Sequence, residues 1–544
     1  MMKSSTYLFT MLLFILGASC SDSKEEKIPV PPSEQDGDEG ETEEEVQQDF
    51  PENTSNLWKE FVHDASINRS STLLDFSYAG YRHGEESIPE VNYPVYNVCD
   101  YGAIPDDGLS DREAVEKAIE VASQKGQGII YFPKGRFDLR PKDAPNQSIL
   151  IDSDNIILRG AGAGEGGTEL FMEYPNEVLD NTLWNTPELI SFRYIKSTDK
   201  QLAELISDAP KGSFSIEVSS TSGLHIGKWI SIRLKNNDTR LIAEELEPYK
   251  VESEWRELLD QGIQITEYHQ IQNIIGNKVV FKEPMLHQVE SKWGWTMHEY
   301  SHHVGVGVED IAFVGNFKEK FVHHKNAVHD SGFRMLSFMR QVNSWVRRCR
   351  FTNVSEALSV MLSSNVTVHS CHITGNPGHS AIRSQASTRV FIGKVHDEAG
   401  QFHSTGVSKT SIGTVLWRNE TASHSCFESH SSQPRATLLD VCKGGLMPNH
   451  AGGDANAAPN HLSDLVLWNY YKTDSFNGSF NLWTRNNYFQ QPIFVGLQGT
   501  PVTFFSGQVK VNEKQGSEVY PYSLYEAQLK RRLGSLPGWL INLQ

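Results

Sequence analysis

Short apolar runs recur through the second half of the chain at a drifting interval, mostly a little over twenty residues. One apolar residue marks each run: Ile311, Val346, Val366, Val390, Val415, Leu438 and Val466. Asn, Gly and Ser are frequent between the runs. One such repeat cannot bury its own apolar face, so successive repeats must stack on one another. The pattern therefore predicts a β-solenoid.

A second constraint lies near the start of the folded part, where several short elements follow in a fixed order. Ser110 and Glu113 form a capping-box pattern that opens a helix with an apolar stripe, and the helix ends near Gly126. Three strand-like segments follow, at 128–132, 155–162 and 168–171. We expect Asp106, Asp107 and Asp111 to shape this cap rather than to catalyse a reaction.

The order and spacing of residues 96–172 resemble the N-terminal cap and first coils of the pectate-lyase superfamily. The resemblance implies an all-β fold, a right-handed parallel β-helix with an N-terminal capping helix. It also implies that the substrate is a polysaccharide.

The repeat is interrupted between residues 198 and 290, where the pattern predicts antiparallel strands and a polar helix around 253–261. We interpret this segment as an inserted small antiparallel β subdomain. The aromatic segment Phe76–Tyr81 is expected to pack along the first coils, and a last helix is expected near Leu524–Leu533. The predicted division of the chain is a signal peptide (1–20), an acidic spacer (21–55), an N-terminal packing segment (56–95), the cap and first coils (96–197), the inserted subdomain (198–290), the central and late coils (291–505) and a C-terminal cap (506–544).

The first twenty residues have the pattern of an export signal. Lys3 precedes an apolar run, and small residues stand immediately before Cys20. This resembles a bacterial lipoprotein cleavage box, with Cys20 as the lipidated residue; the alternative is an ordinary secretory signal. The acidic residues that follow resemble the tag of Bacteroidetes surface lipoproteins. We expect an outer-membrane lipoprotein exposed at the cell surface.

Charge is concentrated in the predicted spacer. The chain has 49 Lys and Arg against 68 Asp and Glu, a net charge of −19. Residues 21–50 hold 12 carboxylates and 2 lysines, a net of −10, which leaves −9 for the remainder. Such a chain lacks the basic surface that nucleic-acid binding needs. We expect a monomer whose partner is an acidic polysaccharide, held by local cations.

Histidines are concentrated in the repeat region, where 14 of the 20 lie between residues 302 and 461. A zinc site and a ladder of stacked polar side chains are both possible reasons for this excess. One constant offset from Val366, Val390 and Val415 reaches His379, His403 and Glu428. This register predicts one line of ionisable groups on one wall of the solenoid. Other cations and a histidine lie close to this line in sequence: Arg383, Lys409, His430 and Arg435.

These residue types suit β-elimination on a uronic-acid polymer. The substrate carboxylate must be neutralised, a base must remove the C5 proton and an acid must help the leaving oxygen. Arg383 or Arg435 would neutralise the carboxylate. The predicted base is Lys409 or His403, and His379 or His430 would assist the leaving group. No cofactor is required by this scheme, although Glu356 and Glu428 are candidate ligands for Ca²⁺.

Two other functions fit the same fold. A β-helix glycoside hydrolase needs two carboxylates that flank the scissile bond, and residues 340–440 contain no Asp pair of the polygalacturonase type. A solenoid that binds a glycan without cleaving it needs only exposed side chains. Trp345, Trp417, Trp468 and Trp483 are candidate sugar platforms, with core packing the better expectation for at least half of them.

Overall fold

The computed structural model describes residues 50–544 except residue 68. The predicted signal peptide, the lipidation site at Cys20 and almost all of the acidic spacer lie outside the described residues. Within the described part, none of the helices has the length and apolar character needed to cross a bilayer.

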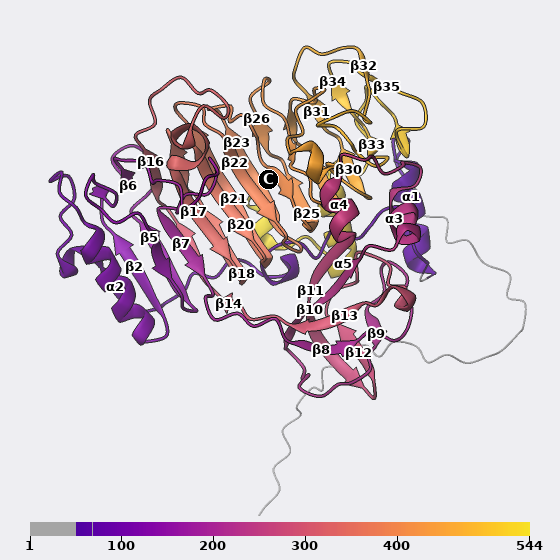
Figure 1. Ribbon diagram of the computed structural model, residues 1–544, viewed down its shortest axis with the longest axis horizontal. Coiled ribbons are helices and arrows are strands. Elements are labelled where there is room, and N and C mark those ends of the chain that lie inside the picture. The colour runs from indigo at the N-terminus through magenta and orange to yellow at the C-terminus, as the bar shows by residue number, and fades with distance from the viewer. Residues whose placement is uncertain (1–49, 68) are drawn as a thin grey trace, which may run out of the picture. The chain divides into compact units, whose positions relative to one another are not determined.

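The described chain winds into a parallel β-helix, as the repeat pattern predicted (Figure 1). Its largest sheet has 21 strands in two connected rows, which the long strands β21 and β23 join. The first row contains β1 (Val95–Asn97), β2 (Gly128–Phe132), β5 (Ile156–Gly160), β14 (His303–Val304), β15 (Gly307–Glu309), β18 (Gln341–Arg347), β21 (Ser364–Thr374), β23 (Phe391–Asp397), β25 (Ile412–Trp417), β28 (Arg435–Asp440), β30 (Leu465–Trp468), β33 (Ile493–Val495) and β36 (Val511–Glu513). The second row contains β3 (Gly135–Asp138), β6 (Thr168–Met172), β16 (Ala312–Gly315), β19 (Arg350–Thr352), β26 (Glu420–Thr421), β29 (Lys443–Gly444), β31 (Tyr471–Lys472) and β34 (Gln498–Gly499).

A separate sheet of seven parallel strands forms another wall of the solenoid. Its strands are β4 (Ile149–Ile151), β7 (Ile190–Arg193), β17 (Arg334–Met339), β20 (Glu356–Met361), β22 (Ser380–Gln385), β24 (Gly406–Ser408) and β27 (Glu428–Ser429). A further pair, β32 (Ser479–Phe480) and β35 (Thr503–Phe504), continues the winding in the late coils.

Apolar side chains at equivalent positions of successive coils stack to form the core. Val346 pairs with Val368, Val368 with Ile392, Ile392 with Leu416 and Leu416 with Leu439, and all five side chains are buried. Hydrogen bonds between adjacent coils of this region join partners 22 or 24 positions apart in the sequence. The coil length was predicted correctly, whereas the predicted register of Val366, Val390 and Val415 was wrong at its last member, because Val415 pairs with Phe391 and not with Val390.

Helix α2 (Arg112–Gln124) covers the first coils, and its buried residues include the predicted stripe. The N-cap is Asp111, without a side-chain capping bond, so the predicted capping box does not form. The Asp111 carboxylate instead accepts hydrogen bonds from the backbone N–H of Ile104 (2.8 Å) and Asp138 (2.9 Å). The side chains of Asp106 and Asp107 likewise accept hydrogen bonds from backbone N–H groups of the cap, those of Arg136 (3.0 Å) and Leu109 (2.8 Å).

The inserted subdomain has a six-stranded antiparallel sheet of β8 (Gln201–Glu204), β9 (Ser215–Glu217), β10 (Trp229–Asn236), β11 (Ile263–Ile275), β12 (Lys278–Phe281) and β13 (Thr296–Glu299). It therefore extends to the end of β13, past the predicted boundary at residue 290. It contains α4 (Arg256–Gln261), inside the predicted helical segment, and also α3 (Thr239–Leu246), which the sequence reading missed. Buried Arg389 of the solenoid donates hydrogen bonds to the backbone carbonyls of Tyr268 (3.1 Å) and Pro284 and thereby anchors the subdomain.

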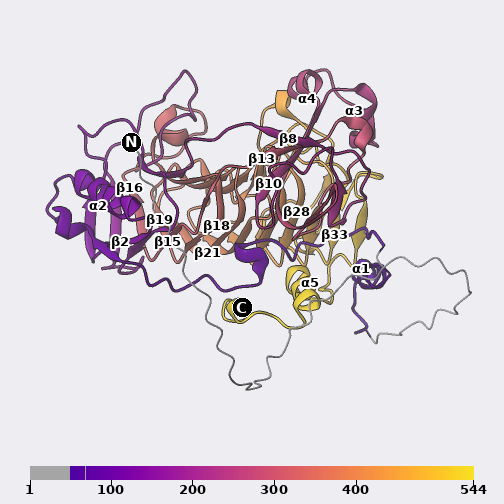
Figure 2. The same ribbon diagram turned by 90° about the horizontal axis from the view of Figure 1, so that it is seen from below.

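The N-terminal and C-terminal segments pack against the outside of the solenoid. Tyr81 N–H donates to Thr367 Oγ1 of β21 (2.7 Å), and the Tyr81 ring belongs to a buried cluster with Ile129 and Ile157 of the first coils. The segment therefore contacts central coils as well as the first ones. Helix α5 (Leu524–Leu533) has the predicted bounds and lies beside the central strands (Figure 2), where Trp417 Nε1 donates to Glu526 (3.0 Å). Helix α1 (Asn56–Ser66) lies at the last rung, because its first N–H donates to Glu513 of β36 (2.6 Å). A short final helix, α6 (Gly538–Ile541), follows α5.

Candidate functional site

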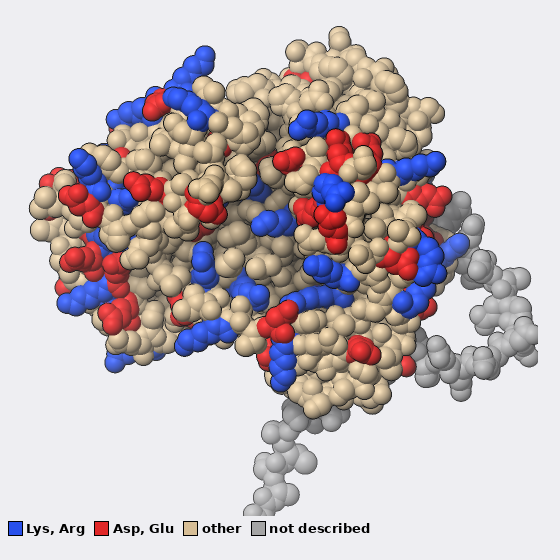
Figure 3. Space-filling view, viewed as in Figure 1, with Lys and Arg blue, Asp and Glu red and all other residues tan. Residues whose placement is uncertain are grey.

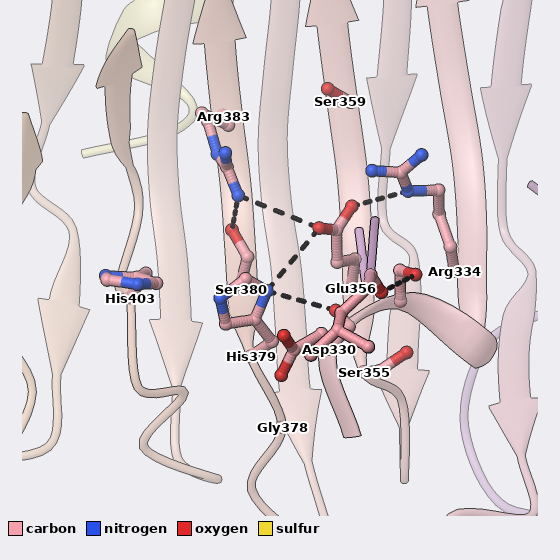
Figure 4. Close-up of polar contacts among 12 residues, drawn as sticks. Asp330, Arg334, Ser355, Glu356, Ser359, Gly378, His379, Ser380, Arg383 and His403 are labelled. Atoms are coloured by element: carbon pink, nitrogen blue, oxygen red, sulfur yellow. Dashed lines mark hydrogen bonds and ion pairs between the residues drawn. The ribbon is translucent and has the colours of Figure 1, made fainter. Parts of the chain in front are cut away.

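Four charged side chains of alternating sign cross the seven-stranded sheet. They come from successive or neighbouring coils: Arg334 from β17, Glu356 from β20, Arg383 from β22 and Glu428 from β27. Arg334 Nε lies 2.6 Å from Glu356 Oε2, and Arg383 lies 3.8 Å from Glu356 and 3.2 Å from Glu428. Figure 4 shows Arg334 and Arg383 on opposite sides of the Glu356 carboxylate. The parallel register aligns Arg334 with Glu356, and it aligns Arg383 with Glu428 through Gly406, so the members of each aligned pair point to the same side of the sheet.

The two carboxylates have opposite electrostatic environments. Burial would raise the pKa of Glu356, but the charges of Arg334, His379 and Arg383 outweigh burial and hold this pKa well below its usual range. Burial raises the pKa of Glu428 to about 7, because Arg383 offsets it only in part and Glu356 adds to it. Among the described residues, neither oxygen of Glu428 has a hydrogen-bond partner.

Three histidines surround Glu428 and Glu356. His379 and His403 lie on adjacent coils with their rings edge to face, the ring centroids 5.0 Å apart. His403 Nδ1 lies 3.5 Å from Glu428 Oε1, and His430 Nε2 lies 3.8 Å from the same oxygen. Burial and the charges of His379, His430 and Arg383 hold the pKa of His403 well below its usual range. At neutral pH His403 is therefore an uncharged imidazole, the form that can accept a proton.

The predicted line through His379, His403 and Glu428 needs a correction. His403 pairs with Ser380, and its backbone N–H donates to the His379 carbonyl (2.9 Å), so the two histidines lie on adjacent coils but one position out of register. Glu428, however, pairs with Gly406, further along the chain than His403. Its side chain still reaches His403 because Gly406 leaves room: a Cβ at Gly406 would lie 2.8 Å from the Cβ of Glu428.

Lys409 directly follows β24 and is exposed to solvent. The protein atoms around it and the positive charge of Arg383 lower its pKa. Lys409 thus adds a cation, close enough for its charge to interact with that of Arg383, that a ligand in solution can reach.

Arg435 does not belong to this cluster. Its side chain is buried and donates to the backbone carbonyl of Gln264 (3.0 Å), and it pairs with Glu245 of α3 (3.2 Å). The prediction that Arg435 could bind a substrate carboxylate is therefore withdrawn. Nearness in sequence to His430 was misleading, because the chain turns toward the inserted subdomain between them.

The space-filling view shows a hollow over the central strands of this wall, with Lys and Arg side chains in and around it (Figure 3). Two segments close over the histidines. Gly452 lies against the rings of His403 and His430, where an added Cβ would be 3.2 and 3.1 Å from them. From the other side, the ring of His323 stacks on exposed Phe402, with centroids 4.1 Å apart.

Four residues of the site were not predicted from the sequence: Arg334, His323, His324 and Asp330. Arg334 precedes its partner Glu356 by 22 positions, one coil length, which was the available signal. The loop that carries His323, His324 and Asp330 lies outside the repeat, so no spacing rule could place it. Trp345, Trp417 and Trp468 are buried and therefore cannot be sugar platforms, whereas Trp483 is partly buried.

The surroundings of Glu356 and Glu428 do not suit calcium. Ca²⁺ takes six to eight oxygen ligands, whereas these carboxylates are flanked by Arg334, Arg383 and histidine nitrogens. Two groups could instead hold a metal that accepts nitrogen ligands: His323 with His324 and His379, and His403 with Glu428 and His430.

Two families match parts of the chain. Residues 95–180 match the family described as rhamnogalacturonase A/epimerase, pectate lyase-like, and residues 400–543 match a domain of unknown function (DUF4955). The first match confirms the resemblance of the cap and first coils to the pectate-lyase superfamily. The second covers Lys409, Glu428 and His430.

Curated relatives match over short stretches. Mannuronan C5-epimerase AlgE1 of Azotobacter vinelandii is 33% identical over 112 residues, 21% of this chain and 8% of that protein. Alginate lyase 7 of the same organism is 37% identical over 70 residues, 13% of this chain and 8% of that protein. The chain thus spans less than a tenth of the length of these relatives.

Solved structures of low identity align over most of the chain. The tailspike protein gp49 of Pseudomonas phage LKA1 has a TM-score of 0.41 at 12% identity, covering 78% of this chain and 79% of that one. An exopolygalacturonase of Thermotoga maritima has a TM-score of 0.33 at 12% identity, covering 81% and 95%.

Proposed function

We propose that this protein cleaves a uronic-acid-containing acidic polysaccharide, of glycosaminoglycan or pectin type, by β-elimination. One observation carries the proposal: an uncharged histidine, His403, faces a buried carboxyl group, Glu428, that itself contacts Arg383. The arrangement supplies a base beside a cation on this wall of the solenoid. The similarity to a mannuronan C5-epimerase and an alginate lyase supports a polysaccharide substrate.

The first requirement is charge neutralisation of the substrate. Removal of the C5 proton beside an ionised carboxylate would create a dianion, which nearby positive charge must stabilise. Arg383 is fixed by Glu356 and Glu428 and by a hydrogen bond from its guanidinium to Ser380 Oγ (2.8 Å). A fixed cation stabilises developing charge without having to reorganise during the reaction.

Proton removal is assigned to His403. Its Nδ1 faces Glu428, which leaves Nε2 to take the C5 proton. When Glu428 is ionised, it accepts a hydrogen bond from Nδ1–H and stabilises the imidazolium that forms, as in other carboxylate–histidine pairs. The C5–H electrons form the C4–C5 double bond as the C4–O bond breaks. Lys409 gives its proton to the leaving oxygen, and solvent restores both protonation states.

The test is a screen of purified protein against uronic-acid polymers, with and without chelator. Elimination yields an unsaturated uronate, which absorbs in the ultraviolet, in step with new chain ends. Arg383→Ala, His403→Ala and Lys409→Ala should each remove this product while the circular dichroism spectrum stays unchanged. Full activity in all three variants would show that the reaction occurs elsewhere.

A glycoside hydrolase is the second candidate. Its supporting observation is the pair Glu356 and Glu428, whose pKa values are displaced in opposite directions, a feature of acid and base carboxylates. Against it, Glu356 is buried and held by Arg334. New reducing ends without the ultraviolet absorbance would favour hydrolysis. Retention on a polysaccharide gel with no product would instead indicate a glycan-binding protein.

We also propose that the enzyme works at the cell surface as a lipoprotein attached through Cys20. The export pattern and the acidic spacer of the sequence support this location. Metabolic labelling with a fatty-acid analogue should mark the protein, and Cys20→Ala should remove the label.

A further inference from the structure

Three histidines from two distant segments meet at the edge of the hollow. His323 and His324 lie in the loop between β16 and β17, and His379 directly precedes β22. We propose that these three residues bind one divalent transition-metal ion of the zinc class. The ion would fasten the loop to the solenoid.

The spacing of the side chains suits a single ion. One ligand atom from each histidine can be chosen such that all three lie within 4.8 Å of one another. The ring centroids of His323 and His324 are 3.6 Å apart, and those of His324 and His379 are 5.9 Å apart. Metal–nitrogen bonds of about 2.0–2.1 Å place the ligand atoms of one ion about 3.4 Å apart, within reach of small side-chain rotations.

The backbone brings the two adjacent histidines together. Neighbouring side chains of an extended segment point in opposite directions, but His324 has a φ of +58°, in the left-handed region. This conformation is unfavourable for a residue with a side chain, and such residues are concentrated at functional sites. Here it turns both rings toward His379.

Asp330 fixes two of the three rings. Its carboxylate Oδ2 lies 2.6 Å from His324 Nδ1, and its backbone carbonyl lies 3.0 Å from His379 Nδ1. Both Nδ1 atoms therefore donate, which leaves the lone pair on Nε2 of each ring. Metal-binding histidines are oriented in this way, by a carboxylate or a carbonyl on the nitrogen that does not bind the metal. Asp330 is itself buried, in the single-turn π-helix Val328–Gly332, a distortion often found at functional sites.

Unpaired buried nitrogens point to a missing ligand. Within residues 50–544, Nε2 of His379 and Nε2 of His323 are buried and have no hydrogen-bond partner. Buried polar atoms are almost always satisfied in folded proteins. A metal ion would satisfy one atom of each ring.

Ligand chemistry selects the metal and the site. Three imidazoles suit Zn²⁺, Co²⁺, Ni²⁺ or Cu²⁺ and not Ca²⁺ or Mg²⁺. The neighbouring group of His403, Glu428 and His430 is less suitable, because the Arg383 cation lies 3.2 Å from its only carboxylate. Among the described residues, the ion pairs of the histidine triad are with the carboxylates of Asp330 and Glu356, and none is with an Arg or Lys.

The experiment uses the full chain, stripped with chelator, desalted and titrated with Zn²⁺ in a calorimeter. Co²⁺ loading gives a second readout, since cobalt with nitrogen ligands absorbs in the visible range. We expect one ion per chain. His324→Ala should abolish binding, and Asp330→Asn should weaken it by about 10–100-fold.

His372→Ala is the matched control. His372 and His396 also stack, with centroids 5.2 Å apart, but on another wall. This variant should bind Zn²⁺ as the unmodified protein does. The His324 side chain is 48% exposed, so its replacement should leave the fold intact. The melting temperature without metal checks this.

Three results would overturn the proposal. The first is no uptake of Zn²⁺ or Co²⁺ by the unmodified chain, and the second is unchanged binding by His324→Ala. The third is that His430→Ala loses binding while His324→Ala keeps it. The third result would mean that the metal binds to the group of His403, Glu428 and His430 instead. None of these results depends on the polysaccharide activity, so the two proposals fail separately.

Discussion

Glu428 shows how one buried side chain can link activity to pH. Burial raises its pKa to about 7, and its ionised form strengthens the His403 base. We expect kcat to rise as pH increases through about 7. Glu428→Gln should remove this rise and lower kcat by about 10² or more. Initial rates between pH 5 and 9 for both proteins check the prediction; an unchanged profile in the variant would assign the rise to another group.

The same carboxyl group should make stability depend on pH in the opposite direction. Its pKa is higher in the folded chain than the usual 4.5, so the folded state holds the proton more tightly. This contribution is complete below about pH 4.5 and is lost as pH rises through about 7, by up to about 3 kcal/mol. Denaturant unfolding of the unmodified protein and of Glu428→Gln should show a difference that shrinks at acidic pH. A constant difference would mean that the pKa of Glu428 is the same in the folded and unfolded chain.

Lys409 offers a cleaner test of a catalytic role because it is exposed. Lys409→Ala should change the free energy of unfolding by no more than about 0.5 kcal/mol, yet lower kcat by about 10²-fold. The control is Lys443→Ala, another exposed lysine, which pairs with Glu420 (3.0 Å) on a different wall. Normal activity of Lys409→Ala would remove Lys409 from the mechanism.

At the scale of elements, the inserted subdomain is held to the solenoid by buried arginines. Arg435 joins β28 to α3 through Glu245. Removing one partner of a buried ion pair leaves the other charge uncompensated, so Arg435→Met should destabilise the fold by about 3–5 kcal/mol. Since the buried Arg435 side chain is directed at the subdomain and away from the hollow, the folded variant should keep its kcat.

The double variant Arg435→Met with Glu245→Gln should recover part of the lost stability, because no unpaired charge then remains. Thermal unfolding measures the recovery. If Arg435→Met stays stable but its kcat falls, Arg435 would be part of the active site after all.

For the whole molecule, substrate binding depends on local positive charge within a negatively charged chain. Exposed charges further apart than about 10 Å are screened at about 0.1 M salt. We expect KM for an anionic polymer to rise about 3–10-fold between about 0.05 and 0.5 M salt, with kcat nearly constant. Lys409→Ala should show a smaller rise. A fall in KM with salt would mean that repulsion by the acidic body dominates.

Several features followed directly from the sequence. Apolar residues at coil-length spacing must stack, which predicted both the solenoid and the length of its coils. Helix α5 has the bounds expected from the sequence, and in the structure Ser523 caps its start and Gly534 ends it. His379, Arg383, His403, Glu428 and His430 were selected for their residue types, and the structure brings them together. Their catalytic roles remain predictions.

What the tertiary structure alone decided is where segments outside the repeat lie. Because apolar residues stack at intervals of one coil, their spacing in the sequence fixes which coil a residue belongs to. A small change in the length of one turn is enough to alter the pairing, and Glu428 therefore lies opposite Gly406. Loops and inserted segments obey no period. Arg435 was therefore drawn toward Glu245, while His323, His324 and Asp330 came to lie against His379. Contacts between residues distant in sequence depend on how the whole chain packs, so local sequence patterns do not predict them.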